Sequence, residues 1–283
     1  MIAVELTGGI GNQLFQYAAG RCVAERNKVP LKLDIHNLKN FDSRNFDLEK
    51  FHTGILFATE EEIRNLRPSG NVAKLRQYLE PKFQRTYHRE RSFRYDKSFR
   101  NIGPNAYLKG YFQCEDYFAP IADILRKEFT LKEEYTPNVL NLSLQLKNEN
   151  SVALHVRRGD YTKPEMRTFH GVLTPDYYIA AMQLMLERNP GSKFFLFSDD
   201  IKWAKENLPT DNITCVSGEY SKNHFEDFYL MSQCQHNIIA NSSYSWWTAW
   251  LNANPNKVVI GPEQWFTDTK NNQDRTPTGW LRI

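Results

Sequence analysis

Seven residues in the second half of the chain, His155-Val-Arg-Arg-Gly-Asp-Tyr161, combine two guanidiniums, a carboxylate, a glycine and two polar rings. They directly follow an apolar run, 152–154, that is typical of a buried strand. In an open parallel sheet the ligand binds beyond the carboxyl ends of the strands. Arg157 and Arg158 carry planar, permanently charged groups that suit phosphate oxygens. The stretch therefore favours a phosphate-bearing substrate, although an Arg-Arg pair is also typical of solvated surface or of ion pairs.

A glycine-rich turn follows the first expected strand. It reads Gly8-Gly-Ile-Gly-Asn-Gln13, and its glycines, including Gly9 and Gly11, allow backbone N–H groups to approach a ligand at a helix start. No Lys-Ser/Thr pair follows, which excludes a Walker A loop, and the spacing differs from the dinucleotide-binding GxGxxG pattern. By itself the turn is weak evidence for any one ligand.

Two further polar segments follow expected strands. Ser198-Asp-Asp200 offers carboxylates for ribose hydroxyls or a base edge, and the alternative is that an aspartate caps the next helix. Asn241-Ser-Ser-Tyr-Ser-Trp-Trp247 opens a helix whose hydroxyls and backbone N–H groups form a ready anion site. Capping by Ser242 or Ser243, with the tryptophans in the core, is compatible with anion binding. A metal is disfavoured at Ser198-Asp-Asp200, because no third carboxylate lies nearby.

The elements that must position these loops alternate between strand and helix. Up to a polar stretch at 130–150 we expect strands at 2–7, 31–35 and 107–112 and helices at 12–26, 60–65 and 121–129. After it we expect strands at 152–156, 194–197, 213–216, 238–240 and 258–260 and helices at 175–189, 201–207, 225–234 and 243–252. This spacing indicates parallel, doubly wound sheets. The sequence thus predicts an α/β protein with domains at 1–145 and 150–265 and a tail at 266–283.

Composition narrows the class of protein. The 283 residues are 41% hydrophobic and 24% charged, which is typical of a soluble globular protein, and no apolar run is long enough to span a bilayer. The chain opens directly into an expected strand without the features of a secretion signal, so we expect a cytoplasmic protein. The four cysteines are far apart and form no cluster with histidines, which argues against zinc and against a disulfide framework.

One segment is strongly basic. From Lys82 to Arg100 seven basic residues are interleaved with five aromatic ones, against only two acidic residues. A partly buried segment with a charged outer face is the favoured interpretation. Contact with an anionic membrane surface is the second interpretation, and nucleic-acid binding is the weakest of the three.

Five motifs, in this order, resemble those of the galactoside alpha-1,2-fucosyltransferases of bacterial type, in glycosyltransferase family 11. They are Gly8-Gly-Ile-Gly-Asn-Gln-Leu-Phe-Gln-Tyr17, Gly110-Tyr-Phe-Gln-Cys-Glu-Asp-Tyr-Phe118, His155-Val-Arg-Arg-Gly-Asp-Tyr161, Ser198-Asp-Asp200 and the segment from Tyr229 to Trp247. The resemblance runs from residue 1 to about residue 265, and the combination is specific although each motif alone is not. Tyr244 stands where Phe is usual and Cys114 where Ser is frequent, and neither departure would carry chemistry.

The resemblance implies a GT-B-like architecture, with two Rossmann-like domains facing a central cleft. It implies transfer of L-fucose, with inversion, from GDP-L-fucose to O2 of a terminal β-galactose, with no metal or other cofactor. Acceptor-side residues would be Gly9, Gly11, Asn12 and Gln13. Donor-binding residues would be His155, Arg157, Arg158, Ser198, Asp199, Asp200, Asn241, Ser242, Ser243, Tyr244 and Ser245, although His155 ends a buried-looking strand, which slightly favours a structural role.

The expected catalytic roles follow from the chemistry of an inverting transfer. Arg157 and Arg158, assisted by Ser243, Ser245 and the start of their helix, would stabilise the charge that grows on the diphosphate. Asp160 is the first candidate for the base that takes the acceptor proton, with Glu165 second, and Asn12 or Gln13 would orient the acceptor. A carboxylate beside arginines is a weak base, so the alternative is that Asp160 holds an arginine in place.

A bacterial-type enzyme of this kind would work in the cytoplasm, at the inner face of the membrane, on a β-galactoside oligosaccharide or a lipid-linked glycan. Three alternatives stay open from the residues alone: another fucosyl linkage, a related deoxyhexose donor, and a protein that binds nucleotide sugars or glycans without catalysis. The intact Arg157, Arg158 and Asp160 argue against the third.

Overall fold

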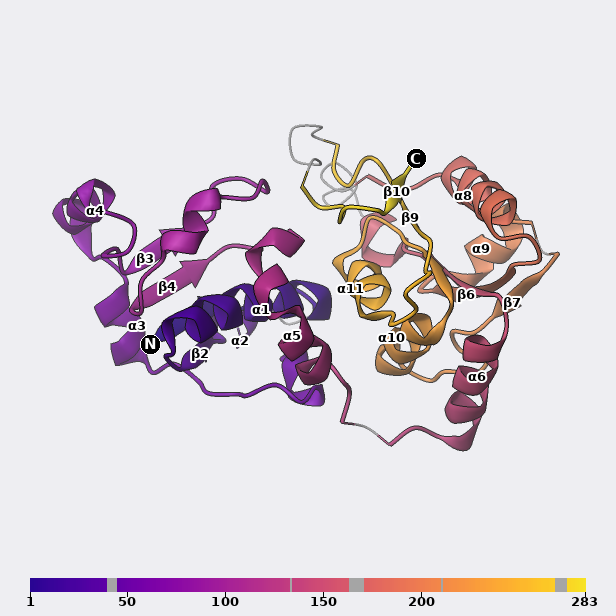
Figure 1. The fold of residues 1–283 in the computed structure, drawn as a ribbon, viewed down its shortest axis with the longest axis horizontal. Helices are drawn as coiled ribbons and strands as arrows, with labels where there is room; N and C mark the ends of the chain where they lie inside the picture. Colours follow the sequence, from indigo (N-terminus) through magenta and orange to yellow (C-terminus); the bar gives the residue numbers. More distant parts are fainter. Residues whose placement is uncertain (40–44, 133, 163–170, 210, 268–273) are drawn as a thin grey trace. The chain divides into compact units, whose positions relative to one another are not determined.

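The computed structural model describes residues 1–39, 45–132, 134–162, 171–209, 211–267 and 274–283 (Figure 1). The chain folds into two compact units, Met1–Lys132 and Glu133–Ile283. Each unit contains one parallel sheet covered by helices. Among the described residues no helix is both long enough and apolar enough to cross a bilayer.

The first unit is built on a four-stranded parallel sheet of order β2-β1-β4-β3. Its strands are β1 (Ile2–Glu5), β2 (Leu31–Asp34), β3 (Tyr87–Arg89) and β4 (Ala106–Lys109). Its α-helices are α1 (Ile10–Asn27), α2 (His36–Lys39), α3 (Glu60–Leu66), α4 (Gly70–Leu79) and α5 (Ala122–Glu128). Short 3-10 helices lie at Asp47–Lys50, Lys97–Asn101, Glu115–Tyr117 and Ala119–Ile121.

Helices α1 and α3 pack on this sheet. Helix α1 is buried along most of its length and packs on β1 and β2. Helix α3 begins with a capping box, in which Thr59 accepts from the Glu62 N–H and Glu62 accepts from the Thr59 N–H. Ile63 and Leu66 on α3 pack against Ala3 and Tyr107 of the sheet. The result is a three-layer arrangement that leaves the carboxyl ends of the strands at one edge.

The second unit is built on a six-stranded parallel sheet of order β10-β9-β8-β5-β6-β7. Its strands are β5 (Ser151–Val156), β6 (Lys193–Ser198), β7 (Ile213–Cys215), β8 (His236–Ile238), β9 (Val259–Gly261) and β10 (Leu281–Arg282). Its α-helices are α6 (Pro137–Asn148), α8 (Pro175–Arg188), α9 (Ile201–Asn207), α10 (His224–Gln233) and α11 (Ser243–Leu251), and a 3-10 helix lies at Gly159–Thr162.

Strand β5 lies in the middle of this sheet and is buried on both faces. Val152, Leu154 and Val156 pack with residues of α8 and α9, whereas Ala153 packs with residues of α6 and α10. The alternation follows from the two-residue period of a strand. The chain adds β6 and β7 on one side of β5 and then adds β8, β9 and β10 on the other side. The order of the strands therefore reverses beside β5. Such a switch point is where open α/β sheets bind ligands.

The predicted α/β class with parallel, doubly wound sheets is confirmed, and each expected strand and helix is present with its ends shifted by a few residues. Helices α2 and α4 and strands β3 and β10 were not expected. The boundary between the two compact units lies after Lys132, near the start of the polar stretch at 130–150. Helix α6 belongs to the second unit, because it packs there through Val139, Leu142 and Leu146. Residues 281–282, within the expected tail, extend the second sheet.

Candidate active site

The loop after β5 lies at the switch point and carries the two arginines. Because Val156 of β5 pairs with Ser198 of β6, the Arg157-Arg158 pair emerges beside Asp199-Asp200. The Arg157 Nη1 atom lies 2.8 Å from the Asp199 Oδ2 atom, and the Arg158 Nε atom lies 3.3 Å from the Asp200 Oδ2 atom. The Arg158 backbone N–H also donates to Asp199 Oδ1 at 2.9 Å. The two sequence motifs therefore form one network.

Each partner in this network is fixed by a second contact. The Arg158 guanidinium lies 3.9 Å above the centre of the Trp203 ring, which orients its planar fork. Asp200 is the N-cap of α9 and accepts from the Trp203 N–H at 3.1 Å through its other oxygen. The capping alternative is thus correct for Asp200, and both carboxylates hold arginines. Contact of either one with the nucleoside stays a prediction. Ser198 is part of the same turn, where its hydroxyl accepts from the Asp200 N–H at 2.9 Å.

The serine-rich helix start adjoins the arginine loop. Tyr161, whose ring lies 5.6 Å from the Arg157 guanidinium, donates its hydroxyl to the Asn241 carbonyl at 3.2 Å. Ser242 is the N-cap of α11, and its side chain makes no capping hydrogen bond with the described residues. The N–H groups of the first turn of α11 are therefore not capped by this hydroxyl. An N-terminus of this kind favours an anion.

Two residues predicted to bind the donor make internal contacts. Ser245 is fully buried, and its hydroxyl lies 3.3 Å from the Ser242 carbonyl oxygen, while its contact with the donor stays a prediction. Tyr244 donates its hydroxyl to the His224 carbonyl and packs its ring against Phe228. Both side chains fix the start of α11. Ser243 remains half-buried at the first helical position.

His155 is buried beneath the loop. Burial, together with the nearby Arg157 charge, lowers the pKa of His155 to about 3, so the imidazole is neutral at pH 7. Its ring lies 5.5 Å from the Tyr244 ring. Within the described residues its Nδ1 atom has no hydrogen-bond partner. Burial and ring packing agree with a structural role for His155, and its contact with the donor stays a prediction.

The two candidate bases lie outside what the structure describes. The described part of the chain includes neither the side chain of Asp160 nor any part of Glu165. Their roles stay predictions. No group of three or more potential metal-ligating His, Cys, Asp or Glu side chains occurs in the described part of the chain.

In the first unit the glycine-rich turn follows β1 and opens α1. Gly8 has a φ of 77°, a backbone conformation that glycine adopts readily. Gln13 is fully buried: its amide donates to the carbonyls of Gly8 and Asn45, and its oxygen accepts from the Asp47 N–H. Gln13 therefore shapes the turn, and its contact with the acceptor stays a prediction. Asn12 is half-buried and accepts from the Gln113 amide at 2.5 Å. Gly9 lies half-buried as the N-cap of α1, and Gly11 is buried within it.

A polar network at the carboxyl ends of β1, β2 and β4 was not predicted as a site. The Asp34 carboxylate accepts from the Tyr107 hydroxyl at 2.6 Å and lies 2.6 Å from the His36 Nδ1 atom. Lys109 bridges to Glu5 at 2.8 Å in the same region. Burial alone would raise the pKa of Asp34, but the hydrogen bonds from Tyr107 and His36 lower it below its usual value. The signal for this network was the position of Glu5, Asp34 and Lys109 at strand ends.

The His36 side chain is half exposed, whereas its partner Asp34 is buried. A carboxylate behind an imidazole fixes the orientation and tautomer of the ring, which is the arrangement of a general base. No single motif would reveal this pair in a sequence, because two residues separated by one position are common.

Comparisons with known proteins extend these observations. The model of the family described as "Glycosyl transferase family 11" matches residues 1–283. Two proteins of Escherichia coli are each 32% identical: an alpha-1,2-colitosyltransferase, with 100% of this chain and 99% of the relative aligned, and the O-antigen biosynthesis glycosyltransferase WbnK, with 98% and 99% aligned. The human galactoside alpha-(1,2)-fucosyltransferase 1 is 27% identical over 51% of this chain and 42% of its own length.

The fold has a counterpart among solved structures. The structure of the Arabidopsis thaliana FUT1 mutant R284K in complex with GDP matches 99% of this chain and 75% of that chain, with a TM-score of 0.51 and 11% sequence identity. This likeness concerns the fold alone and agrees with the expected GT-B-like class. Since the family model covers the whole length and the two bacterial relatives align along nearly all of it, the chain belongs to glycosyl transferase family 11.

Proposed function

We propose that this protein transfers L-fucose from GDP-L-fucose to O2 of a terminal β-galactose, with inversion and without a metal. The observation that carries the proposal is the convergence of Arg157, Arg158 and the start of α11 at the switch point of the second sheet. A diphosphate needs such a combination of guanidiniums and backbone N–H groups. The names of the E. coli and human relatives, one a colitosyltransferase and one a fucosyltransferase, support a deoxyhexose and an alpha-1,2 linkage.

The arginines carry the electrostatic part of the reaction. As the bond between the sugar and the diphosphate lengthens, negative charge grows on the phosphate oxygens and a fixed positive charge lowers the barrier. Asp199 and Asp200 hold the guanidiniums in place before the donor binds, so no reorganisation is needed when the charge develops. Ser242 and Ser243 lie at the helix start, where a hydroxyl and N–H groups reach the same anion.

Calorimetry tests the donor. With a chelator present, we expect the purified protein to bind GDP-L-fucose and to bind GDP-mannose and UDP-galactose far more weakly. Arg158→Gln should lower kcat for transfer to lactose by roughly 10²–10³, because one charge-assisted contact to the leaving group is lost. Lys202→Gln, which changes an exposed charge on α9, is the matched control and should leave transfer unchanged. No binding to any guanine nucleotide would overturn the proposal.

Three groups are candidates for the base. Asp160 and Glu165 follow the arginines in sequence, and His36 has a buried carboxylate partner in Asp34. Removing the true base should lower kcat by about 10²–10⁴. We expect Asp160→Asn to have the larger effect, and His36→Gln is the comparison. If Asp160→Asn stays near wild type while His36→Gln shows that loss, the base is His36, with Asp34 as its positioning residue.

The name of one relative supports a second candidate donor, GDP-colitose. GDP-colitose differs from GDP-L-fucose by the absence of the hydroxyl on C3 of the sugar, and a bacterial relative is named as a colitosyltransferase. A pocket that does not hydrogen-bond this hydroxyl separates the two sugars by only about 10²-fold or less. The ratio of kcat/KM for the two donors decides the question, and a ratio in favour of colitose would replace fucose in the proposal.

The acceptor and the location are proposals of the same kind. One relative is named for O-antigen biosynthesis, which supports a β-galactoside oligosaccharide or a lipid-linked glycan as acceptor, used at the cytoplasmic face of the membrane. Transfer to a β-galactoside and not to the matching α-galactoside is the expected outcome in a product assay, and equal transfer to both would contradict the acceptor assignment.

A further inference from the structure

Helix α4 in the first unit turns its apolar side chains outward. Val72, Leu75 and Leu79 follow one another at spacings of three and four, which places them on one side of the helix, and they are 84%, 61% and 75% exposed. Phe83, just beyond the helix, is 58% exposed. None of the described side chains of α4 is buried. This row of Val72, Leu75, Leu79 and Phe83 is called the apolar row below.

Polar groups attach the helix to the rest of the unit instead. The Gln77 amide donates to the Thr86 hydroxyl, and its oxygen accepts from the Tyr87 N–H at 3.2 Å. Thr86 in turn donates to the Leu66 carbonyl at 2.8 Å. Gln77 thereby fixes α4 beside β3 (Figure 1). A surface helix normally turns its apolar side toward the core, so this reversed orientation calls for an apolar environment outside the unit.

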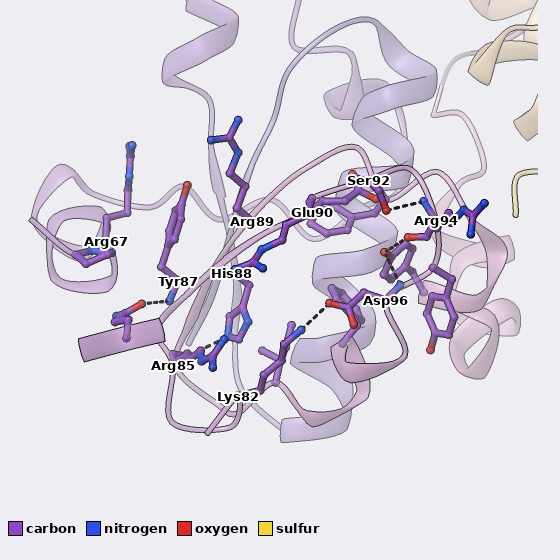
Figure 2. Close-up of a pocket in the computed structure, with 18 residues that line it drawn as sticks. Arg67, Lys82, Arg85, Tyr87, His88, Arg89, Glu90, Ser92, Arg94 and Asp96 are labelled. Carbon is purple, nitrogen blue, oxygen red and sulfur yellow. Dashed lines mark hydrogen bonds and ion pairs between the residues drawn. The ribbon is translucent and has the colours of Figure 1, made fainter. Parts of the chain in front are cut away.

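A basic cavity adjoins the same helix. It has a volume of about 1160 Å³, and Gln77 of α4 contributes to its wall. Its cationic side chains are Arg67, Lys82, Arg85, Arg89, Arg91 and Arg94. Figure 2 shows Arg67 and Arg89 pointing the same way on either side of Tyr87, and both arginines are exposed. Their forks suit phosphate oxygens.

The two acidic side chains of the basic cavity are occupied by internal contacts. Glu90 accepts from the backbone N–H groups of Tyr111 and Phe112, at 2.7 and 3.1 Å. Asp96 accepts from Lys82 at 2.6 Å and from the Ser98 N–H at 3.0 Å. Residues 67–100 contain ten basic and three acidic residues, a net charge of +7, whereas the whole chain carries +3. Positive charge is therefore concentrated around α4, and the remainder of the chain is net negative.

We propose that the apolar row and the basic cavity together dock this protein on a bilayer of anionic phospholipid. The apolar row would enter the boundary between headgroups and acyl chains, while Arg67 and Arg89 would meet lipid phosphates. Exposed apolar side chains and clustered arginines in the same segment, residues 67–94, match the two layers of such a surface, apolar below and anionic above. A nucleic acid would bind the positively charged side chains but would leave the apolar row exposed to water. A second copy of this chain would cover the row but would oppose one +7 segment to another.

Vesicle flotation of the full chain tests this proposal independently of the proposed reaction. We expect the protein to float with vesicles of equal parts phosphatidylglycerol and phosphatidylcholine, to remain unbound with phosphatidylcholine alone, and to be released by high salt. Leu75→Gln with Leu79→Gln should lower binding by about tenfold or more, because the apolar surface that enters the bilayer is lost. Arg67→Gln with Arg89→Gln should lower it by about tenfold and weaken the salt dependence.

Matched controls come from the second unit. Leu140→Gln with Leu144→Gln removes two exposed leucines of α6, and Lys193→Gln with Lys202→Gln removes two exposed charges, so neither should change vesicle binding. All variants should keep the wild-type circular dichroism and the wild-type binding of GDP-L-fucose. The proposal fails if the wild type does not bind anionic vesicles, or if the variants of the apolar row bind these vesicles as weakly or as strongly as the control variants do. It also fails if the wild type is a dimer that does not bind vesicles and the double variant Leu75→Gln with Leu79→Gln is a monomer. In that case a second copy of this chain covers the apolar row.

Discussion

Gly159 lies where the carboxylate of Asp199 comes closest to the backbone of the arginine loop. A Cβ atom at this position would lie 2.5 Å from the Asp199 Oδ2 atom. The carboxylate cannot move aside cheaply, because Arg157 Nη1 and the Arg158 N–H both hold it. The glycine in the His155–Tyr161 motif is thus explained by side-chain crowding, and its φ is not in the left-handed region.

The substitution Gly159→Ala should therefore displace Asp199 and, with it, Arg157. We expect kcat/KM for the donor to fall between about tenfold and a hundredfold, since small displacements of positioned groups have effects of this size. Gly54→Ala is the control, because a Cβ there meets no atom within 4 Å. Steady-state kinetics at varied donor concentration measures both variants. Wild-type kinetics in Gly159→Ala would show that the contact between Asp199 and Arg157 does not matter for transfer.

Among the elements, helix α3 owes its start to a local signal that can be tested. Thr59→Ala removes the hydroxyl that accepts from the Glu62 N–H, so we expect the free energy of unfolding to fall by about 1 kcal/mol. Thr174 is also an N-cap, at α8, but its side chain makes no capping bond. Thr174→Ala should lower the free energy of unfolding by clearly less than Thr59→Ala does. Urea unfolding of the two variants gives the comparison, and equal losses would contradict the capping argument.

Signals of this local kind explain which elements were predictable. The central strands were predictable because they are short apolar runs, buried throughout in β1 and β5, and the helices were predictable because apolar residues recur every three to four positions. Helix α4 was not predicted, although its apolar residues recur at helical spacings, because the Pro-Ser-Gly stretch at 68–70 directly before them favours a loop. Strand β10 has two residues and no period at all. The pair of Asp34 and His36 was missed for another reason: its meaning depends on the pairing of β1 with β2 and β4, which no local pattern encodes.

At the scale of the whole molecule, buried histidines link stability to pH. Burial lowers the pKa of His88 to about 4 and, with the Arg157 charge, that of His155 to about 3; burial also lowers the pKa of His236. The ordinary pKa of histidine, which applies to the unfolded chain, is 6.5. Between these values the unfolded chain binds protons that the folded chain does not. The stabilisation is therefore complete above the unfolded pKa and is lost as the pH falls toward the folded pKa values.

We expect the free energy of unfolding to decrease from pH 7.5 to pH 5.5, with His155 alone contributing a slope of up to about 1.4 kcal/mol per pH unit. Urea unfolding at the two pH values measures the change. His155→Asn should reduce the slope, whereas His52→Asn, at an exposed position, should leave it unchanged. Equal free energies at both pH values in the wild type would refute the assignment of neutral, buried histidines.

The wholly parallel sheets also determine how the chain must acquire its structure. The central strand of the first sheet, β1, pairs at Ile2 with Ala106, and the central strand of the second, β5, pairs at Val152 with His236. During synthesis each of these apolar strands therefore waits for a partner that is made many residues later. Until then its edges are open to other chains. Refolding should accordingly be slow and compete with aggregation, because non-local pairing must precede burial.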